Sequence, residues 1–237
     1  MRSFRSAPEP LAPGSLGFAH RGLHGPGVPE NSLASAQGAL AIGAGIECDV
    51  RMARDGVPMV FHDEALDRLT GRQGCLRDLP SGAAAELPLL GTAETIPALS
   101  GLLQLIDGKV PLLVEIKREP GLGLLCRSVA ELLSGYDGRI AVMSFDPRVP
   151  RWFANNAPRL SRGLVIDSRL KPWWRPLFLA AARPQFLAVD CRAVEQPWVA
   201  VQRARMPVYS WTVRSPLDRA KVAKFADAPI WEGDRRP

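Results

Sequence analysis

The sequence predicts one α/β domain folded as a TIM (β/α)8 barrel. Its 237 residues suit a single barrel, and short apolar runs alternate with helix-length segments along most of the chain. This alternation is typical of a parallel sheet covered by helices. An open doubly wound sheet is the alternative, and it is weakened because no GxGxxG motif follows an early strand. We expect residues 1–237 to form a single catalytic domain.

The first predicted unit is a strand, a loop and a helix. Residues 1–15 contain three prolines and show little periodicity, so they are expected to lead into a strand at 16–20. After a loop, Asn31 or Ser32 can cap a helix that ends at the glycines of residues 43–45.

Two predicted strands then follow without a helix between them. Residues 46–52 and 57–62 have strand character and are joined by a turn at Asp55-Gly56. Residues 63–97 lose regular alternation, so we expect a small insertion after the third strand.

Later apolar runs supply the rest of the sheet. They lie at residues 110–116, 139–144, 162–166, 186–189 and 207–211. Another candidate lies at 229–232, so one of these runs is expected to lie outside a ring of eight strands.

The composition is ordinary for a globular protein and carries a net charge of +6. The basic excess favours anionic partners, although a solvated basic surface explains it equally well. No nucleic-acid-binding signature is present, and the four scattered cysteines form no zinc motif, which favours reduced thiols. The chain contains no signal-peptide segment or 18-residue apolar stretch, so we expect a cytoplasmic protein that does not span a membrane. Oligomeric state is not predicted.

Acidic residues on two predicted strands indicate a metal site. Residues two apart on a strand point to the same side, so Glu47 and Asp49 project together, as do Glu115 and Lys117. Three carboxylates at one barrel mouth suit a hard divalent cation, Mg2+ or Ca2+. Any one of them could instead form an ordinary salt bridge, but burial of all three without a shared purpose would be costly.

Two histidines and two cations near these carboxylates indicate phosphate chemistry. His20 and His62 each end a predicted strand, and a pair of imidazoles can serve as general base and general acid. Arg21 offers a planar fork of donors that matches phosphate oxygens, and Lys117 can add a point charge. The combination predicts a site for a phosphate ester.

Ordered motifs through the chain resemble those of the glycerophosphodiester phosphodiesterase family. The match is dense in the first half and continues more thinly through Ser144-Phe145 and Trp211-Thr212-Val213. The segments that carry most of it are His20-Arg21-Gly22, Pro29-Glu30-Asn31-Ser32, Glu47-Cys48-Asp49-Val50, Asp55-Gly56, His62-Asp63, Leu66-Asp67-Arg68-Leu69-Thr70 and Glu115-Ile116-Lys117.

The resemblance implies a TIM barrel with an insertion after His62-Asp63 and a hydrolysis that releases glycerol 3-phosphate and an alcohol. A cyclic phosphate could precede attack by water, and the sequence does not decide between the two routes. The implied roles are a divalent metal held by Glu47, Asp49 and Glu115, an acid/base pair of His20 and His62, phosphate contacts from Arg21 and Lys117, and a substrate pocket that includes Glu30 and Trp211.

The chain departs from the family pattern near its end. Arg214 stands where the family usually has Asn, and Ile230-Trp231-Glu232-Gly233 replaces a hydrophobic pair followed by Thr-Asp. We expect the second change to alter the substrate pocket. His24, in the first loop, is expected to lie in solvent.

The aromatic and basic segment 170–179 has two interpretations. It could rest on an anionic membrane surface, or form a barrel helix that starts near Pro172 and packs its tryptophans on the sheet, which we favour. The membrane interpretation is linked to an alternative activity, that of a lysophospholipase D on longer lipids. A barrel that binds phosphorylated ligands without turnover is the other alternative.

Overall fold

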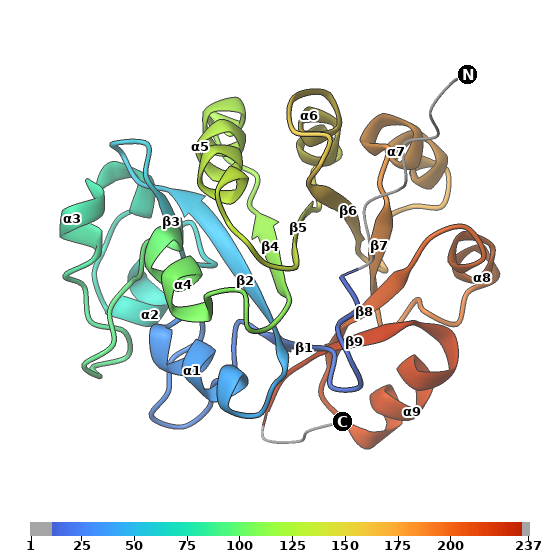
Figure 1. Ribbon diagram of the computed structural model, residues 1–237, viewed down its shortest axis with the longest axis horizontal. Coiled ribbons are helices and arrows are strands. Elements are labelled where there is room, and N and C mark those ends of the chain that lie inside the picture. Colours follow the sequence, from blue (N-terminus) through green and yellow to red (C-terminus); the bar gives the residue numbers. More distant parts are fainter. Residues whose placement is uncertain (1–10, 234–237) are drawn as a thin grey trace.

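Eight parallel strands close into a ring in the computed structural model, which describes residues 11–233 (Figure 1). The order around the ring is β1-β9-β8-β7-β6-β5-β4-β2, and pairing between β1 and β2 closes it. The fold is the predicted TIM barrel. Its strands are β1 (Phe18–His20), β2 (Gly45–Met52), β4 (Leu112–Ile116), β5 (Ile140–Ser144), β6 (Ser161–Ile166), β7 (Phe186–Asp190), β8 (Val208–Val213) and β9 (Ala228–Trp231).

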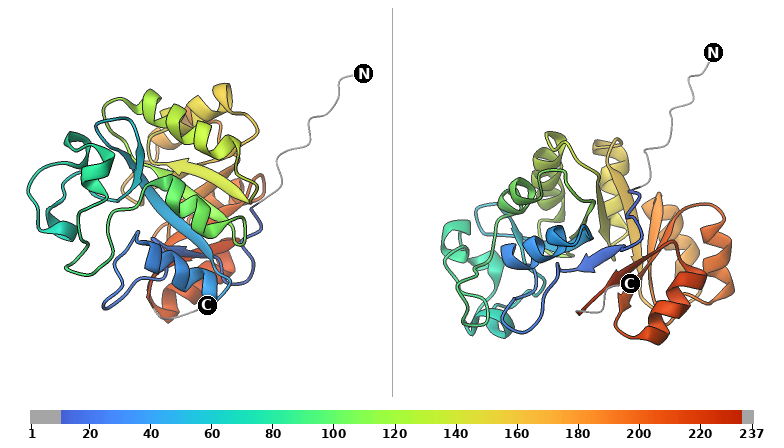
Figure 2. Two further views of the ribbon diagram at one scale, coloured as in Figure 1. Left: turned by 60° about the vertical axis from the view of Figure 1, so that its left-hand side comes forward. Right: turned by 60° about the horizontal axis from the view of Figure 1, so that its bottom comes forward.

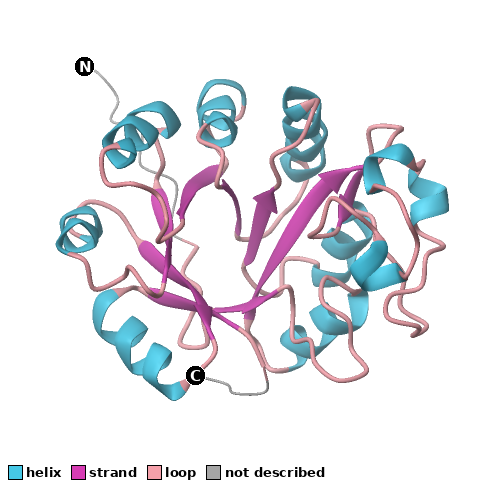
Figure 3. Cartoon of the chain, turned by 180° about the vertical axis from the view of Figure 1, so that it is seen from behind, coloured by secondary structure: helices cyan, strands magenta, loops and turns pink. Residues whose placement is uncertain are grey.

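Helices surround this ring on its outer side (Figure 3). Ser32 is the N-cap of the first one, because its hydroxyl accepts a hydrogen bond from the Ser35 amide. The helices of the outer layer are α1 (Leu33–Ala41), α4 (Leu99–Ile106), α5 (Leu122–Ser134), α6 (Arg148–Asn156), α7 (Trp174–Ala182), α8 (Pro197–Arg203) and α9 (Pro216–Phe225).

The extra strand lies in the first half of the chain. β3 (Pro58–Val60) pairs antiparallel with β2 and has no place in the ring. The candidate at 229–232 belongs to β9, which completes the ring between β8 and β1. The run that lies outside the ring is therefore 57–62.

The insertion after β3 packs on a small hydrophobic cluster that it shares with residues in and next to β3. It contains α2 (Asp67–Thr70), the 3-10 helix η1 (Leu76–Asp78) and α3 (Ser81–Ala84). Figure 2 shows this teal segment beside the ring in both views. The buried side chains of the cluster are Ala53, Met59, Phe61, Leu66, Leu69, Leu76, Ala84, Leu89 and Ile96.

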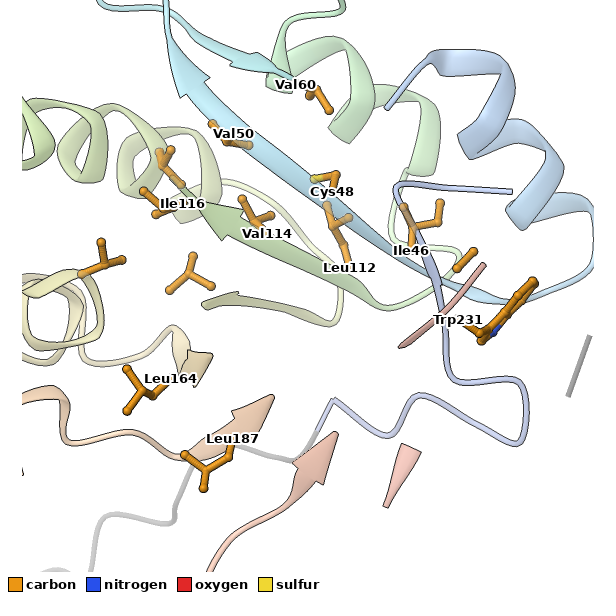
Figure 4. Close-up of a cluster of buried hydrophobic side chains, with 14 of the residues drawn as sticks. Ile46, Cys48, Val50, Val60, Leu112, Val114, Ile116, Leu164, Leu187 and Trp231 are labelled. Carbon is orange, nitrogen blue, oxygen red and sulfur yellow. The ribbon is translucent and has the colours of Figure 1, made fainter. Parts of the chain in front are cut away.

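Alternation along β2 separates the core from the site. Ile46, Cys48 and Val50 belong to the large hydrophobic cluster between the ring and its helices (Figure 4). Residues between them point to the opposite side of the strand, toward the barrel interior. The predicted same-side pair, Glu47 and Asp49, is buried there.

The predicted barrel helix forms, but it begins at Trp174, two residues after Pro172, and its tryptophans do not pack on the sheet. Trp173 is 64% exposed and Trp174 is 47% exposed. Both stand at the start of α7, where a barrel helix leaves the loop that follows the preceding strand. Among the described residues, no helix combines the length and apolar character needed to cross a bilayer.

Candidate active site

A cavity of about 420 Å3 opens at the carboxyl ends of the ring strands. This end of a barrel is where enzymes of the fold carry their catalytic groups, because eight strands deliver side chains to one place. Most of the predicted site residues line it. They are His20, Arg21, Glu47, His62, Glu115, Lys117 and Trp211.

Three carboxylates form the buried floor of this site. Glu47, Asp49 and Glu115 each offer an oxygen within 4.8 Å of the others. Burial raises the pKa of Glu47 well above its usual value, and the charges of Asp49 and Glu115 raise it further. Burial also raises the pKa of Glu115, although Lys117 opposes this. The cluster therefore disfavours full ionisation unless a cation is close.

Two basic side chains meet the same carboxylates. The Lys117 ammonium lies 2.7 Å from Asp49 Oδ1 and also pairs with Glu115. Arg21 Nε lies 3.1 Å from Asp49 Oδ2, and the Arg21 amide donates to Glu47. Burial alone would raise the pKa of Asp49, but Lys117 and Arg21 hold it well below its usual range.

The donor set fits a hard divalent cation. Three carboxylates meet only two basic groups, so full ionisation of the cluster would leave negative charge unmatched and a bound cation would favour it. Glu47 Oε1 is buried and has no hydrogen-bond partner among the described residues, which leaves it open to a metal ligand role. Asn31 fixes the neighbouring carboxylate, because its amide group donates to Asp49 Oδ2 at 2.9 Å. All the candidate ligands are oxygens, as Mg2+ and Ca2+ prefer.

His20 ends β1 at the edge of the cavity and is only 8% exposed. Its Nδ1 lies 2.6 Å from Glu232 Oε1, and its Nε2 lies 3.9 Å from Glu47 Oε2. Burial lowers the pKa of the imidazole, although the hydrogen bond to Glu232 opposes the shift. Glu232 also meets Arg214, whose Nε donates to Oε2 at 2.6 Å.

His62 lies just after β3 and lines the same cavity as His20. Its Nδ1 lies 2.6 Å from Oδ1 of the adjacent Asp63, and 32% of its side chain is exposed. Asp63 also accepts a hydrogen bond from Arg68 Nε. Burial lowers the pKa of His62, and the Asp49 charge counteracts this.

Glu30 lies outside the set of described residues that line the cavity. Its carboxylate accepts hydrogen bonds from Arg21 at 2.7 Å and from both Nη atoms of Arg68. It therefore bridges Arg21 to the Arg68 and Asp63 pair. The structure gives it a supporting position behind Arg21 instead of a direct contact with the cavity.

The far wall of the cavity combines aromatic and polar side chains. Trp211 packs edge-on against Phe145 with ring centroids 5.3 Å apart, and its indole donates to the Ala188 carbonyl. Asp190 and Arg192 line the same wall. Asp190 and Trp211 belong to β7 and β8, which lie across the ring from β2 and β4, the strands that carry the carboxylates.

A repeated Asp-x-Arg motif follows three successive ring strands. In each copy the arginine Nη2 lies 2.6 Å from the aspartate Oδ2, and its amide also donates to the aspartate. The aspartates are mostly buried and the arginines are exposed. The three pairs are Asp146 with Arg148, Asp167 with Arg169, and Asp190 with Arg192.

Sequence reasoning missed the direct contact between Glu232 and His20. The two residues are 212 positions apart, so no spacing rule connects them. The only signal was the departure from the family pattern at Arg214 and Glu232, two residues that prove to be bonded to each other. His24 was expected in solvent, but it is partly buried, and its Nε2 has no hydrogen-bond partner among the described residues.

The fold and the position of the cavity define a barrel enzyme, since the acidic cluster and both histidines lie at the catalytic end of the ring. The model of the glycerophosphoryl diester phosphodiesterase family matches residues 20–230. The chain belongs to this family of phosphoric diester hydrolases.

Individual relatives agree with this membership. A glycerophosphodiester phosphodiesterase from Caldanaerobacter subterraneus is 30% identical over 229 residues, which cover 89% of this chain and 90% of the relative. The glycerophosphodiester phosphodiesterase of Thermotoga maritima is 25% identical, with a TM-score of 0.77 over 92% of this chain and 94% of that one. An Oleispira antarctica phosphodiesterase, solved with its product sn-glycerol-3-phosphate, is 24% identical and has a TM-score of 0.80 over 91% and 92% of the two chains.

Proposed function

We propose that this protein hydrolyses glycerophosphodiesters to glycerol 3-phosphate and an alcohol, as a single catalytic domain that uses a divalent cation. The observation that carries the proposal is the buried cluster of Glu47, Asp49 and Glu115 at a cavity that two histidines also line. The product bound to the Oleispira phosphodiesterase supports the choice of product. A cavity of about 420 Å3 is also the size expected for a small-molecule site.

Mg2+ or Ca2+ held by Glu47, Asp49 and Glu115 would neutralise charge on the phosphate and polarise it for attack. Arg21 and Lys117 lie beside these carboxylates and would contact the remaining phosphate oxygens. The substrate phosphate would then lie in the cavity that His20 and His62 both line.

The two histidines would move the protons. One imidazole takes a proton from the attacking hydroxyl as its oxygen bonds to phosphorus, and the other gives a proton to the alcohol oxygen as its bond to phosphorus breaks. The attacking hydroxyl belongs to the substrate's glycerol, by way of a cyclic phosphate, or to water. Both routes need the same pair, His20 and His62.

The direct test is a substrate panel. Purified protein is incubated with glycerophosphocholine and glycerophosphoethanolamine, each with Mg2+, Ca2+ or Mn2+, and glycerol 3-phosphate is measured. We expect product that chelator abolishes and an added cation restores. Metal-dependent binding of these compounds without any product would contradict hydrolysis and support a binding barrel instead.

Metal binding is tested without activity through thermal unfolding. Cation at about 100 times its Kd should stabilise the wild-type protein by about 2.7 kcal/mol. In Glu47→Gln this stabilisation should be lost, because one of the three carboxylate ligands is removed. Glu195→Gln is the matched control, since Glu195 pairs with Lys221 on the surface. An equal stabilisation of wild type and Glu47→Gln would contradict the assigned ligands.

A second candidate, activity on longer lipids at a membrane surface, is favoured by the exposed start of α7. Trp173 and Leu177 are 64% and 58% exposed, and the Lys171 ammonium lies 5.3 Å from the centre of the Trp173 ring. Arg169, at the same loop, is 84% exposed in its side chain. Aromatic and basic side chains in this arrangement suit an anionic lipid interface.

Vesicles containing phosphatidylserine or only phosphatidylcholine separate the two candidates. A lipid-directed enzyme should sediment with the anionic vesicles and hydrolyse lysophospholipids faster than glycerophosphocholine. Trp173→Ala should then weaken sedimentation without changing the rate on glycerophosphocholine, because Trp173 does not line the cavity. Absence of binding to either vesicle would exclude the surface role.

A further inference from the structure

The end of β9 brings a carboxylate to the buried edge of His20. Glu232 follows Trp231 directly, and its Oε1 lies 2.6 Å from His20 Nδ1. Arg214, just after β8, donates to the same carboxylate from Nε at 2.6 Å and from Nη2 at 3.1 Å. Neighbouring strands of the ring, β8, β9 and β1, therefore present three charged or titratable groups in one bonded chain.

The backbone around Glu232 is held firmly. The Glu232 amide donates to the Val213 carbonyl at 3.1 Å. Trp231, which is 1% exposed, donates from its indole to the Leu16 carbonyl at 2.7 Å. The carboxylate of Glu232 thus projects from a fixed point, and Arg214 restrains its direction.

We propose that Glu232 is a positioning residue that keeps the proton of neutral His20 on Nδ1 and makes its Nε2 the proton acceptor of the reaction. A carboxylate can only accept from the ring nitrogen that faces it, so Nδ1 must carry the hydrogen. The other ring nitrogen, Nε2, then carries no hydrogen. It faces Glu47, whose Oε2 lies 3.9 Å away. This inference rests on the proposed function, and it assigns the role of proton donor to His62.

Proton transfer and bond exchange at phosphorus occur together in this reaction. The attacking hydroxyl gives its proton to His20 Nε2 while its oxygen bonds to phosphorus, and the bond from phosphorus to the alcohol oxygen breaks. Protonated His62 gives its proton to that oxygen. The ring of His20 is then positively charged, and the carboxylate at Nδ1 stabilises this charge, as the aspartate does in the Ser-His-Asp arrangement.

Arg214 is the second part of the arrangement. It contacts both oxygens of Glu232, so it limits rotation of the carboxylate away from His20. Because its side chain is 63% exposed, water can replace it more easily than it can replace Glu232. Loss of the Arg214 side chain should therefore weaken the hydrogen bond between Glu232 and His20 without abolishing it.

The tautomer of His20 is directly measurable. The chain has three histidines, so the imidazole nitrogens can be followed in 15N-labelled protein and assigned with single His→Gln variants. In the wild-type protein with Mg2+, we expect a protonated Nδ1 and an unprotonated Nε2 at His20. In Glu232→Ala this preference should disappear. An unprotonated Nδ1 in the wild-type protein would overturn the proposal.

Kinetics give a second readout. Glu232→Ala should lower kcat by about 10- to 100-fold and leave KM within about twofold, since Glu232 acts through His20 and does not line the cavity. Glu232→Gln, whose amide oxygen would face Arg214 and whose NH2 group would donate to His20 Nδ1, should favour the other tautomer and lose at least as much activity as Glu232→Ala. Arg214→Ala should lose less. Glu195→Gln is again the control.

The outcomes separate this inference from the proposed function. Wild-type protein that shows the expected tautomer but hydrolyses no glycerophosphodiester would contradict the function while the placement of the proton stands. Active protein in which Glu232→Ala and Glu232→Gln keep wild-type kcat would overturn the role of Glu232 alone. If Glu232→Ala fails to fold, the wild-type spectrum and the Glu232→Gln variant still decide.

Discussion

The two histidines of the site have the same partner chemistry but very different surroundings. Each Nδ1 lies 2.6 Å from a carboxylate oxygen. For His20 this oxygen comes from Glu232, 212 residues away, and the imidazole is almost fully buried. For His62 it comes from the next residue, Asp63, and about a third of the imidazole side chain is exposed. One pairing depends on closure of the barrel, and the other is built locally.

The difference indicates how far each pairing should withstand change. Water can reach His62 and Asp63 and can substitute for a lost hydrogen bond there. At His20, a lost partner would leave a buried ring nitrogen without an acceptor, which is costly. Loss of the carboxylate partner should therefore reduce activity more at His20, on β1, than at His62, after β3.

Removing either imidazole should have the largest effect. We expect His20→Ala and His62→Ala each to lower kcat by about 100- to 10,000-fold, because each removes one of the two proton-transfer groups. Steady-state rates on glycerophosphocholine measure this, and thermal unfolding confirms that both variants fold. Full activity in His20→Ala would contradict the assigned mechanism.

Removing the carboxylate partners tests the comparison itself. Asp63→Ala should lower kcat by about 3- to 10-fold, less than Glu232→Ala, because solvent can serve as an acceptor at the exposed His62. Both variants are measured with the same substrate and metal. If Asp63→Ala proves the more damaging of the two, then burial does not determine the importance of these pairings.

Much of this site could be predicted because strand geometry is local. Alternation along β2 placed Glu47 and Asp49 on one side, and the structure confirms that these carboxylates lie together with Glu115. The ring of eight strands followed from the alternation of strands and helices. These predictions needed only the directions of side chains on a strand and the length of the segments between strands.

Other features depend on contacts that no local pattern contains. The run at 229–232 could be placed in the ring only by its pairing with β1 and β8. Glu30 was expected in the substrate pocket, but its position behind Arg21 depends on Arg68 from the insertion. Trp173 was expected to pack on the sheet, but the turn that starts α7 leaves it exposed. Each outcome was set by tertiary packing.

The smallest effect is expected at Arg68, which links the two supporting carboxylates on the side of His62. Its side chain is 47% exposed and pairs with both Glu30 and Asp63. Exposed ion pairs contribute about 0 to 1 kcal/mol, since solvent screens them and ordering the side chains costs entropy. Arg68→Ala should therefore change the free energy of unfolding by no more than about 1 kcal/mol.

We expect kcat of Arg68→Ala to stay within about threefold of wild type, because Arg21 still holds Glu30 and His62 still contacts Asp63. Denaturant unfolding and steady-state kinetics measure the two quantities. A loss of kcat as large as that of Glu232→Ala would show that the local pairing at His62 also depends on distant support, and the contrast between the two histidines would fail.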